Sequence, residues 1–367
     1  MPLSEERLVS SALSPGAVLE AAALLLVFVG VLFLGSMALP GTRIEGPQVD
    51  GKSRTYRLNG LTLFLATVVV MALAHVSGWF SLSALHTRFA ALFVAANVFS
   101  FALSGLLYWR GARAQEAAPG FWRGFFFGRD LSPAWFGVDL KMFSYRPSLI
   151  GLALFNASFA VAQYETYGGL TPAMALYQVF TFLYVLNYFQ FEHGMVHTWD
   201  LISERFGWML VWGDYVLVPF FYCLAGWWLV DVPGQPLSPM AAGAIVLLFI
   251  LGFWLFRGAN EQKHRFKRDP GATIWGQPAR SLDGRLLVSG FWGIGRHLNY
   301  TGEICIYLAF ALTTGFASWV PYLLPAWLAC LLWHRSRRDE RRCRAKYGEL
   351  WWRYKQRVRY SMLPYVY

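Results

Sequence analysis

Residues 238–257 read SPMAAGAIVLLFILGFWLFR and run almost directly into the polar stretch Asn260-Glu261-Gln262-Lys263. An apolar run of this length matches the roughly 20 residues that a helix needs to cross the hydrocarbon core of a bilayer. The polar residues after it predict that the helix leaves the membrane with ionisable groups at its end. Because such groups are costly near hydrocarbon, they are expected to serve a function.

Similar apolar stretches recur along the whole chain and predict nine membrane spans. They cover residues 16–40, 61–80, 89–109, 148–167, 172–190, 207–230, 238–257, 303–318 and 319–334. The last two are short and are joined without a charged loop, which indicates a tight helical hairpin. The predicted fold class is therefore an all-α, polytopic integral membrane protein.

The composition supports a membrane protein and argues against several other classes. Of the 367 residues, 56% are hydrophobic and only 14% are charged, whereas soluble domains carry about 25% charged residues. The net charge of +11 comes from basic residues in the loops between apolar stretches, so it does not indicate binding to nucleic acid. The four cysteines have neither paired nor metal-ligand spacing, which argues against disulfides and a metal site.

The basic loops predict the orientation of the chain. Basic residues gather in 41–60, 110–147, 258–302 and 335–367 and are scarce in 81–88, 168–171 and 231–237. With nine crossings, every rich loop and the C-terminus fall on one face, which we take as cytoplasmic. We divide the chain into an N-terminal tail (1–15), a helical region (16–257) and a C-terminal half (258–367) with the last hairpin and a cytoplasmic tail.

Two lysines at the end of the seventh span are the first candidate ligand-binding residues. Lys263 and Lys267 are four residues apart, so on a helix they share one face. Two neighbouring cations suit a phosphate, such as the 2′-phosphate that distinguishes NADPH from NADH. The alternative is the ordinary enrichment of basic residues on the cytoplasmic side.

A second group of polar residues follows a turn rich in glycine and tryptophan. Its members can donate hydrogen bonds to a pyrophosphate or an amide, and they are Arg296, His297, Asn299 and Tyr300. Trp292 can stack on a planar ring. No GxGxxG follows a strand and no Walker sequence occurs, so any dinucleotide is not held by a Rossmann unit.

A polar stripe is predicted on the last long helix. Arg335, Asp339 and Cys343 recur at four-residue spacing, which places them on one helix face. The plainer interpretation is an i,i+4 ion pair on a solvated helix. Tyr347 and Tyr354 lie in the same short tail, and their presence favours a buried polar site.

The middle of the chain carries a separate polar concentration around Glu192. This residue ends an aromatic helix that includes Tyr184. A carboxyl group in apolar surroundings favours its protonated form and can act as a general acid. A carboxylate that marks a helix end at the water interface explains Glu192 equally well.

Several motifs resemble the sterol reductase family, which includes the Δ14-, Δ7- and Δ24(28)-sterol reductases and the lamin B receptor membrane domain. The most specific is Leu332-Trp333-His334-Arg335 with Arg338-Asp339, Cys343 and Lys346-Tyr347-Gly348, where Trp333 replaces a usually aliphatic residue. Asp139-Leu140-Lys141-Met142-Phe143, followed by Arg146-Pro147-Ser148-Leu149-Ile150-Gly151, resembles the family's entry to the fourth span. The preceding Leu131-Ser132-Pro133-Ala134 departs from the usual Leu-Asn-Pro-Arg.

The resemblance implies about ten helices, with NADPH bound in the C-terminal half and a sterol entering from the bilayer into a pocket of the 16–257 region. Lys263 and Lys267 then correspond to the residues near the adenosine phosphate. The pyrophosphate-to-nicotinamide lining corresponds to Trp292, Arg296, His297, Asn299 and Tyr300. The remaining cofactor wall corresponds to Arg335, Asp339, Cys343, Tyr347 and Tyr354, with Asp339 near the nicotinamide. No obligatory protein partner is implied.

Reduction of an isolated alkene needs a proton before the hydride, because the alkene itself is a poor hydride acceptor. Protonation gives a tertiary carbocation, which a dry site protects from water. The candidate acids are Glu192, Tyr184 and Asp339. The motifs at 289–293 and 206–214 resemble those of the Δ7-sterol reductases, and this resemblance places Δ7 reduction slightly ahead of Δ14, with Δ24(28) third.

Two other classes of protein remain open from the sequence. Arg296-His297, Tyr300 and the later tyrosines also resemble isoprenylcysteine carboxyl methyltransferases, which bind S-adenosylmethionine and share this C-terminal architecture. A non-catalytic scaffold of the lamin B receptor type is the other. The arginine-rich loops suit a bacterial inner membrane or the endoplasmic reticulum.

Overall fold

The computed structural model describes residues 13–46, 53–114, 120–231 and 237–366. Its contacts divide the chain into two compact units, Met1–Pro233 and Gly234–Tyr367, and each is considered by itself. Most of the tail expected at 1–15 lies outside the described residues. The functional division expected at 257/258 stays a prediction.

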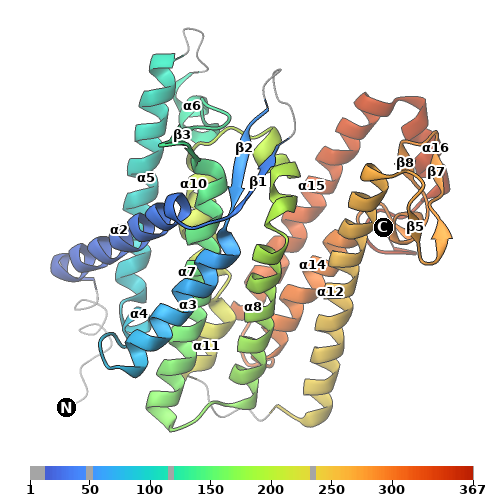
Figure 1. Ribbon diagram of the computed structural model, residues 1–367. Helices are drawn as coiled ribbons and strands as arrows, with labels where there is room; N and C mark the ends of the chain where they lie inside the picture. The colour runs from blue at the N-terminus through green and yellow to red at the C-terminus, as the bar shows by residue number, and fades with distance from the viewer. Residues whose placement is uncertain (1–12, 47–52, 115–119, 232–236, 367) are drawn as a thin grey trace. The chain divides into compact units, whose positions relative to one another are not determined.

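The first unit is built from long helices (Figure 1). They are α2 (Pro15–Ala38), α3 (Gly60–Val76), α5 (Phe89–Ala114), α7 (Leu140–Tyr167) and α8 (Pro172–Gln190). Shorter helices join them: α4 (Ser83–Thr87), α6 (Phe121–Phe127), η1 (Glu192–His197), α9 (Trp199–Ile202), α10 (Trp208–Trp212), η2 (Gly213–Phe221) and α11 (Leu224–Asp231). Helix α7 packs against α2, α3, α4, α8, η2 and α11 and provides much of the core.

The span expected at 207–230 consists of three helical pieces. Helix α10 passes into the π-helical segment η2, and α11 follows after a short turn. Pro219 lies inside η2. Since proline has no backbone N–H to donate, it disturbs the regular α-helical hydrogen bonding of its own turn.

The second unit has three long helices and several short elements. The long helices are α12 (Pro239–Arg268), α14 (Leu298–Leu312) and α15 (Leu323–Tyr347). The short ones are α13 (Phe291–Ile294), η3 (Val320–Tyr322) and α16 (Glu349–Arg357). Helix α12 continues well beyond residue 257, and α15 continues beyond residue 334. Helix α14 begins before the expected 303 and ends at Leu312, because Gly315 adopts a positive φ of 67° shortly after it.

The structure is mostly helical, as the sequence predicts, and three of the loops add short strands that the sequence did not predict. These loops form four short antiparallel hairpins. Their strands are β1 (Thr42–Glu45) with β2 (Thr55–Leu58), β3 (Ala134–Trp135) with β4 (Val138–Asp139), β5 (Thr273–Ile274) with β6 (Gln277–Pro278), and β7 (Ser281–Leu282) with β8 (Leu286–Leu287). Two tight turns are Phe136-Gly137 and Trp275-Gly276, in which both residues have positive φ. Turns of this kind match the twist of antiparallel strands.

Close backbone packing joins α12 to α14 within the second unit. A Cβ atom placed on Gly302 would lie 2.5 Å from the Phe256 nitrogen and 2.6 Å from the Gly252 oxygen. A Cβ atom on Gly252 would lie 2.8 Å from the Gly302 oxygen. Small residues allow such close approach of membrane helices, so this glycine pair positions the N-terminal half of α14 beside α12.

Four helices among the described residues are long and apolar enough to cross a membrane. They are Pro15–Ala38, Phe89–Arg113, Trp208–Asp231 and Pro239–Arg268, and two shorter apolar helices are Gly60–Val76 and Leu298–Leu312. This supports a multi-pass membrane protein. The count of nine spans stays a prediction.

Candidate functional site

All the residues predicted to hold a cofactor lie in the second unit. Lys263 and Lys267 are on the last turns of α12, and Trp292 to Tyr300 cover α13 and the start of α14. The remaining members are on α15 and α16. Because the site draws on five helices of one compact unit, its geometry can be described without reference to the first unit.

Lys263 and Trp292 form a well-defined contact at the basic C-terminal end of α12. The Lys263 Nζ lies 4.4 Å from the centroid of the Trp292 ring, a cation–π distance. The ring is fixed because Trp292 Nε1 donates a hydrogen bond of 2.7 Å to the Ala259 carbonyl. Lys267 is exposed and has Lys263 and Lys346 as electrostatic neighbours. These three cations make a patch that favours an anion such as a phosphate.

Arg296 holds the C-terminal segment in place. Its guanidinium donates to Glu340 Oε1 at 2.6 Å and 3.1 Å and to the carbonyls of Val358 and Arg359 at 2.6 Å and 2.8 Å. The side chain is only 5% exposed. These contacts use each nitrogen of the guanidinium, so they favour a structural role over the predicted contact with a pyrophosphate.

His297 and Asn299 present polar atoms that have no partner among the described residues. The His297 ring stacks on Tyr300 with centroids 5.1 Å apart and planes 9° apart. Burial, with smaller contributions from Lys263 and Arg296, lowers the pKa of His297 to about 3, so the ring is neutral. Its Nε2 atom and the Asn299 Oδ1 atom are buried without a hydrogen-bond partner within these residues. Asn299 Nδ2 donates to Asn260 Oδ1 at 3.3 Å.

The predicted stripe on α15 is present as one half-buried face. Arg335, Asp339, Cys343 and Tyr347 are all partly buried, whereas Arg337, Arg338, Arg341 and Arg342 are exposed. The Arg335 side chain is hydrogen-bonded to Tyr300, and Asp339 is an electrostatic neighbour of the same tyrosine. Burial and the Asp339 carboxylate raise the pKa of the Cys343 thiol to about 11, so Cys343 is not a thiolate.

Tyr354 completes the wall from α16. It is 3% exposed, and its hydroxyl donates to the Trp292 carbonyl at 3.3 Å. It packs with Trp351, Val358 and partly buried Cys343 and Tyr347. Tyr354 therefore helps to fix the position of Trp292, through the hydrogen bond, and of the α15 stripe, through packing against Cys343 and Tyr347.

Two acidic residues near this site were not singled out from the sequence. Glu340 accepts from Arg296 and lies 3.6 Å from Lys355 Nζ. Glu303 is an electrostatic neighbour of Arg335 and of Tyr300. Spacing on α14 offered a signal for Glu303, because it lies three residues after Tyr300 and shares its face.

The other two candidate acids lie in the first unit. Glu192 is 5% exposed, and its Oε1 accepts from Arg146 at 3.0 Å while its Oε2 accepts from the Gly60 N–H at 2.9 Å. Arg146 also donates to the Arg57 carbonyl at 2.7 Å. Both carboxylate oxygens are therefore occupied, which favours an anchoring role. Tyr184 is partly buried on α8 and is an electrostatic neighbour of Tyr188.

The second-unit residues fit a phosphorylated dinucleotide. They offer a cationic patch at Lys263 and Lys267, and they offer buried polar atoms at His297 and Asn299 that need a partner. An unpartnered buried polar atom is rare in proteins, and a bound ligand is one way to satisfy it.

Comparison with known proteins decides the family. The pattern of the ergosterol biosynthesis ERG4/ERG24 family matches residues 9–367. The chain belongs to this family. The sterol reductase family predicted from the motifs is thereby confirmed.

Curated relatives cover nearly the same length. A protein named Delta(14)-sterol reductase from Methylotuvimicrobium alcaliphilum is 39% identical over 348 residues, which are 91% of this chain and 81% of that protein. A Delta(14)-sterol reductase from Arabidopsis thaliana is 37% identical over 358 residues, 95% of this chain and 96% of the relative. A third, from Dictyostelium discoideum, is 38% identical over 339 residues, 89% of this chain and 73% of the relative.

Proposed function

We propose that this family member reduces the C14–C15 double bond of a sterol, with NADPH as the hydride donor. The observation that carries the proposal is the cluster in the second unit, where a lysine pair, unpartnered buried polar atoms and the α15 stripe come together. The names of the relatives support Δ14 as the position of the double bond.

Reduction at Δ7 is the second candidate. The sequence motifs around Phe291 and Trp208 favour it, whereas the names of three relatives favour Δ14. Both reactions use the same protonation and hydride steps, so the cofactor and acid assignments do not depend on the choice. Side-chain reduction at Δ24(28) remains the third candidate.

The chain would hold NADPH mainly through three groups of residues. Lys263 and Lys267 bind the adenosine phosphate, and His297 and Asn299 meet polar groups nearer the nicotinamide. Asp339, Cys343 and Tyr347 form the opposing wall on α15. When bound, NADPH supplies the hydride. The Arg296 side chain holds Val358 and Arg359, and Tyr354 holds Trp292, so both act through other residues.

Asp339 is the acid that we propose for the proton step. It lies on the same half-buried face as the cofactor wall, with Arg335 one turn before it. Asp339 would first take up a proton from water, and its carboxyl O–H bond would then break as a new C–H bond forms on the alkene, which leaves a tertiary carbocation and an Asp339 carboxylate. A hydride from bound NADPH would complete the second C–H bond. Neighbouring aromatic side chains exclude water from the carbocation.

Turnover by the purified protein in lipid nanodiscs tests the proposal. Sterols unsaturated at C14, C7 or C24(28) are supplied separately with NADPH, and products are read by mass spectrometry. We expect reduction at C14 and its loss in Asp339→Asn. With deuterated cofactor in ordinary water, the product should carry one deuterium, and in deuterated water with ordinary cofactor again one.

Two outcomes would contradict the proposal. Reduction at C7 alone would replace Δ14 by the second candidate. No reduction of any sterol by folded protein that does not bind NADPH would contradict the reductase mechanism, and binding of S-adenosylmethionine would then favour the methyltransferase alternative.

A further inference from the structure

The first unit contains a cavity of about 510 Å³ that lies apart from the residues assigned to the cofactor and to the proton step. It lies between the end of α2, the β1–β2 hairpin, the β3–β4 hairpin and the start of α7. The residues that matter for its chemistry are Met37, Arg43, Arg57, Phe136, Asp139 and Arg146.

Two arginines face each other directly across the β1–β2 ladder beside this cavity. Arg43 and Arg57 are Cα partners in the antiparallel register, so their side chains project from the same face. Like charges directly opposite each other destabilise a strand pair. The Arg57 guanidinium donates a hydrogen bond to the Met37 carbonyl, a neutral acceptor that fixes the side chain and leaves its charge in place. An anion between the two guanidinium groups would remove the repulsion.

The other charged groups around the cavity leave it electropositive. Arg146 adds a third guanidinium, which is paired with Glu192 outside the lining. Asp139 is the one acidic side chain in the lining, and it already faces Arg54 at 3.7 Å. The lining thus has three arginines and one aspartate, an excess of positive charge that favours an anionic ligand.

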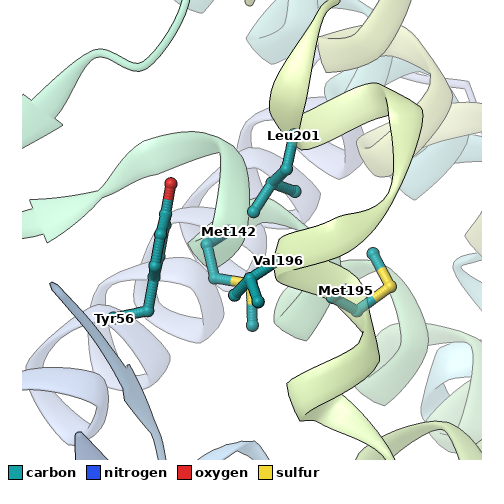
Figure 2. Close-up of a cluster of buried hydrophobic side chains, with 5 residues drawn as sticks. All are labelled: Tyr56, Met142, Met195, Val196 and Leu201. Carbon is teal, nitrogen blue, oxygen red and sulfur yellow. The ribbon is translucent and has the colours of Figure 1, made fainter. Parts of the chain in front are cut away.

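The lining of the cavity also has an apolar part that includes Met37, Tyr56 and Met142. Met37 belongs to α2, on which Leu26, Val31 and Leu34 are 58%, 59% and 64% exposed. Tyr56 and Met142 form another wall and are held by Met195, Val196 and Leu201 (Figure 2). A ligand with an anionic group and a hydrocarbon part could bind the arginines with the first and contact the apolar side chains with the second.

Phe136 gives an independent indication. It is 85% exposed and has a φ of 48°, a conformation that bulky residues rarely adopt. Turns of this type normally carry asparagine, aspartate or glycine at this position. An exposed aromatic ring kept in an unfavourable backbone conformation at a cavity suggests a contact beyond the protein.

We propose that this cavity binds the phosphate of an anionic phospholipid, with the phosphate between Arg43 and Arg57 and the lipid chains along α2. The site is separate from the cofactor cluster, because none of its residues belongs to that cluster. The same phosphate chemistry is offered by soluble phosphates, so lipid and soluble ligands must be compared.

Binding of phosphatidylglycerol to the purified full chain, measured by native mass spectrometry, tests the site. Arg43→Glu is the decisive variant, since it turns the arginine pair into an oppositely charged pair that should leave the hairpin folded. We expect its dissociation constant to rise by at least roughly tenfold. Arg123→Glu, the same charge change at an exposed residue of α6, should leave the constant within about twofold of the wild type.

The contact between Phe136 and the lipid is tested by a second variant, and the contribution of the lipid chains is tested by ligands that lack them. Phe136→Asn suits the turn better than phenylalanine and should keep the fold while weakening binding of the lipid. Glycerol phosphate and inorganic phosphate should bind far more weakly than phosphatidylglycerol. Wild-type affinity in Arg43→Glu would overturn the proposal. Equal affinity for the lipid and for inorganic phosphate would overturn the assignment to a lipid.

Discussion

Glu192 and Arg146 form a buried ion pair, and this pairing determines the anchoring role of Glu192. They form an ion pair of 3.0 Å in which both side chains are about 95% buried. Removing one partner leaves an uncompensated buried charge, which typically costs about 3–5 kcal/mol. We therefore expect Glu192→Ala to lower the free energy of unfolding by about that amount, as measured by chemical denaturation in detergent.

A double variant separates the anchoring role from an acid role. Arg146→Met with Glu192→Met removes both charges and should recover most of the stability lost in Glu192→Ala. If Glu192 were instead the proton donor, the double variant would be stable but inactive. Sterol turnover by the stable double variant, at a rate near that of the wild type, is the result that we expect.

His297 predicts a dependence of stability on pH. Its pKa in the folded protein is lowered to about 3 by burial, below the ordinary value of 6.5. Between these values the unfolded chain binds the proton and the folded chain does not. The contribution of His297 to the free energy of unfolding is therefore fully present above about pH 6.5. It decreases as the pH falls below that value, by up to about 1.4 kcal/mol per pH unit.

Thermal unfolding between pH 7.5 and 5 measures this effect. We expect the midpoint to fall toward acid and the fall to be smaller in His297→Asn, which cannot take up the proton. An identical slope in both proteins would contradict the assignment. The comparison isolates His297 because all other titrating groups are shared.

Lys263 predicts selectivity for the cofactor. If its ammonium group beside Trp292 binds the extra phosphate of NADPH, Lys263→Gln loses one charge-assisted contact. NADPH should then bind about tenfold more weakly, while NADH is little affected. Binding titrations with both cofactors measure the ratio. Arg353→Gln, at an exposed surface ion pair, is the control.

The sequence predicted part of the site at this scale. Spacing alone placed Arg335, Asp339 and Cys343 on one helix face, because that depends only on helical geometry. It could not assign Arg296, since its partners Glu340 and Val358 come from distant parts of the chain. A guanidinium that clamps a backbone and one that binds a phosphate have the same local sequence.

At the scale of elements, three helix starts carry a local signal in the sequence, whereas the starts of α7 and α14 and the hairpins were not predicted. Ser14-Pro15, Thr171-Pro172 and Ser238-Pro239 each begin a helix, with the hydroxyl accepting from a backbone N–H of the first turn. Such pairs combine an N-cap with a residue preset for helix. The hairpins were not predicted because their strands are short. In addition, two of their turns begin with Phe136 and Trp275, and aromatic residues are unusual at turn positions with positive φ.

The contact between α12 and α14 gives a prediction for this scale. Gly302→Ala would place a methyl group against the Gly252 and Phe256 backbones, which cannot move independently of their helix. We expect a loss of roughly 2 kcal/mol or more in unfolding free energy. Gly243→Ala on the same α12 has open space around it and should be neutral or slightly stabilising. Equal effects of the two variants would contradict the close packing.

At the scale of the whole molecule, the charge distribution carries the argument. The net charge of +11 gathers in four loops, and three of these contain the hairpins. The fourth is the tail that contains the α15 stripe and α16. Positively charged loops remain on the cytoplasmic side during membrane insertion. A cofactor cluster formed by two of these loops would therefore face the compartment that supplies NADPH.

Reporter fusions along the chain test this orientation. After Gly128, Gly284 and Gly348, in basic segments, a fused green fluorescent protein should fluoresce, because that reporter folds in the cytoplasm. After Gly78 and Gly169, in segments poor in basic residues, a fused alkaline phosphatase should be active, because that enzyme needs the oxidising side. This alternation of the reporter results requires every helix between two fusion sites to cross the membrane once. That includes α3, which is shorter than the longest spans, and α8, which is not among the four candidate spans. Phosphatase activity after Gly348 would place the cofactor cluster on the wrong side for NADPH and contradict both the orientation and the proposed cofactor.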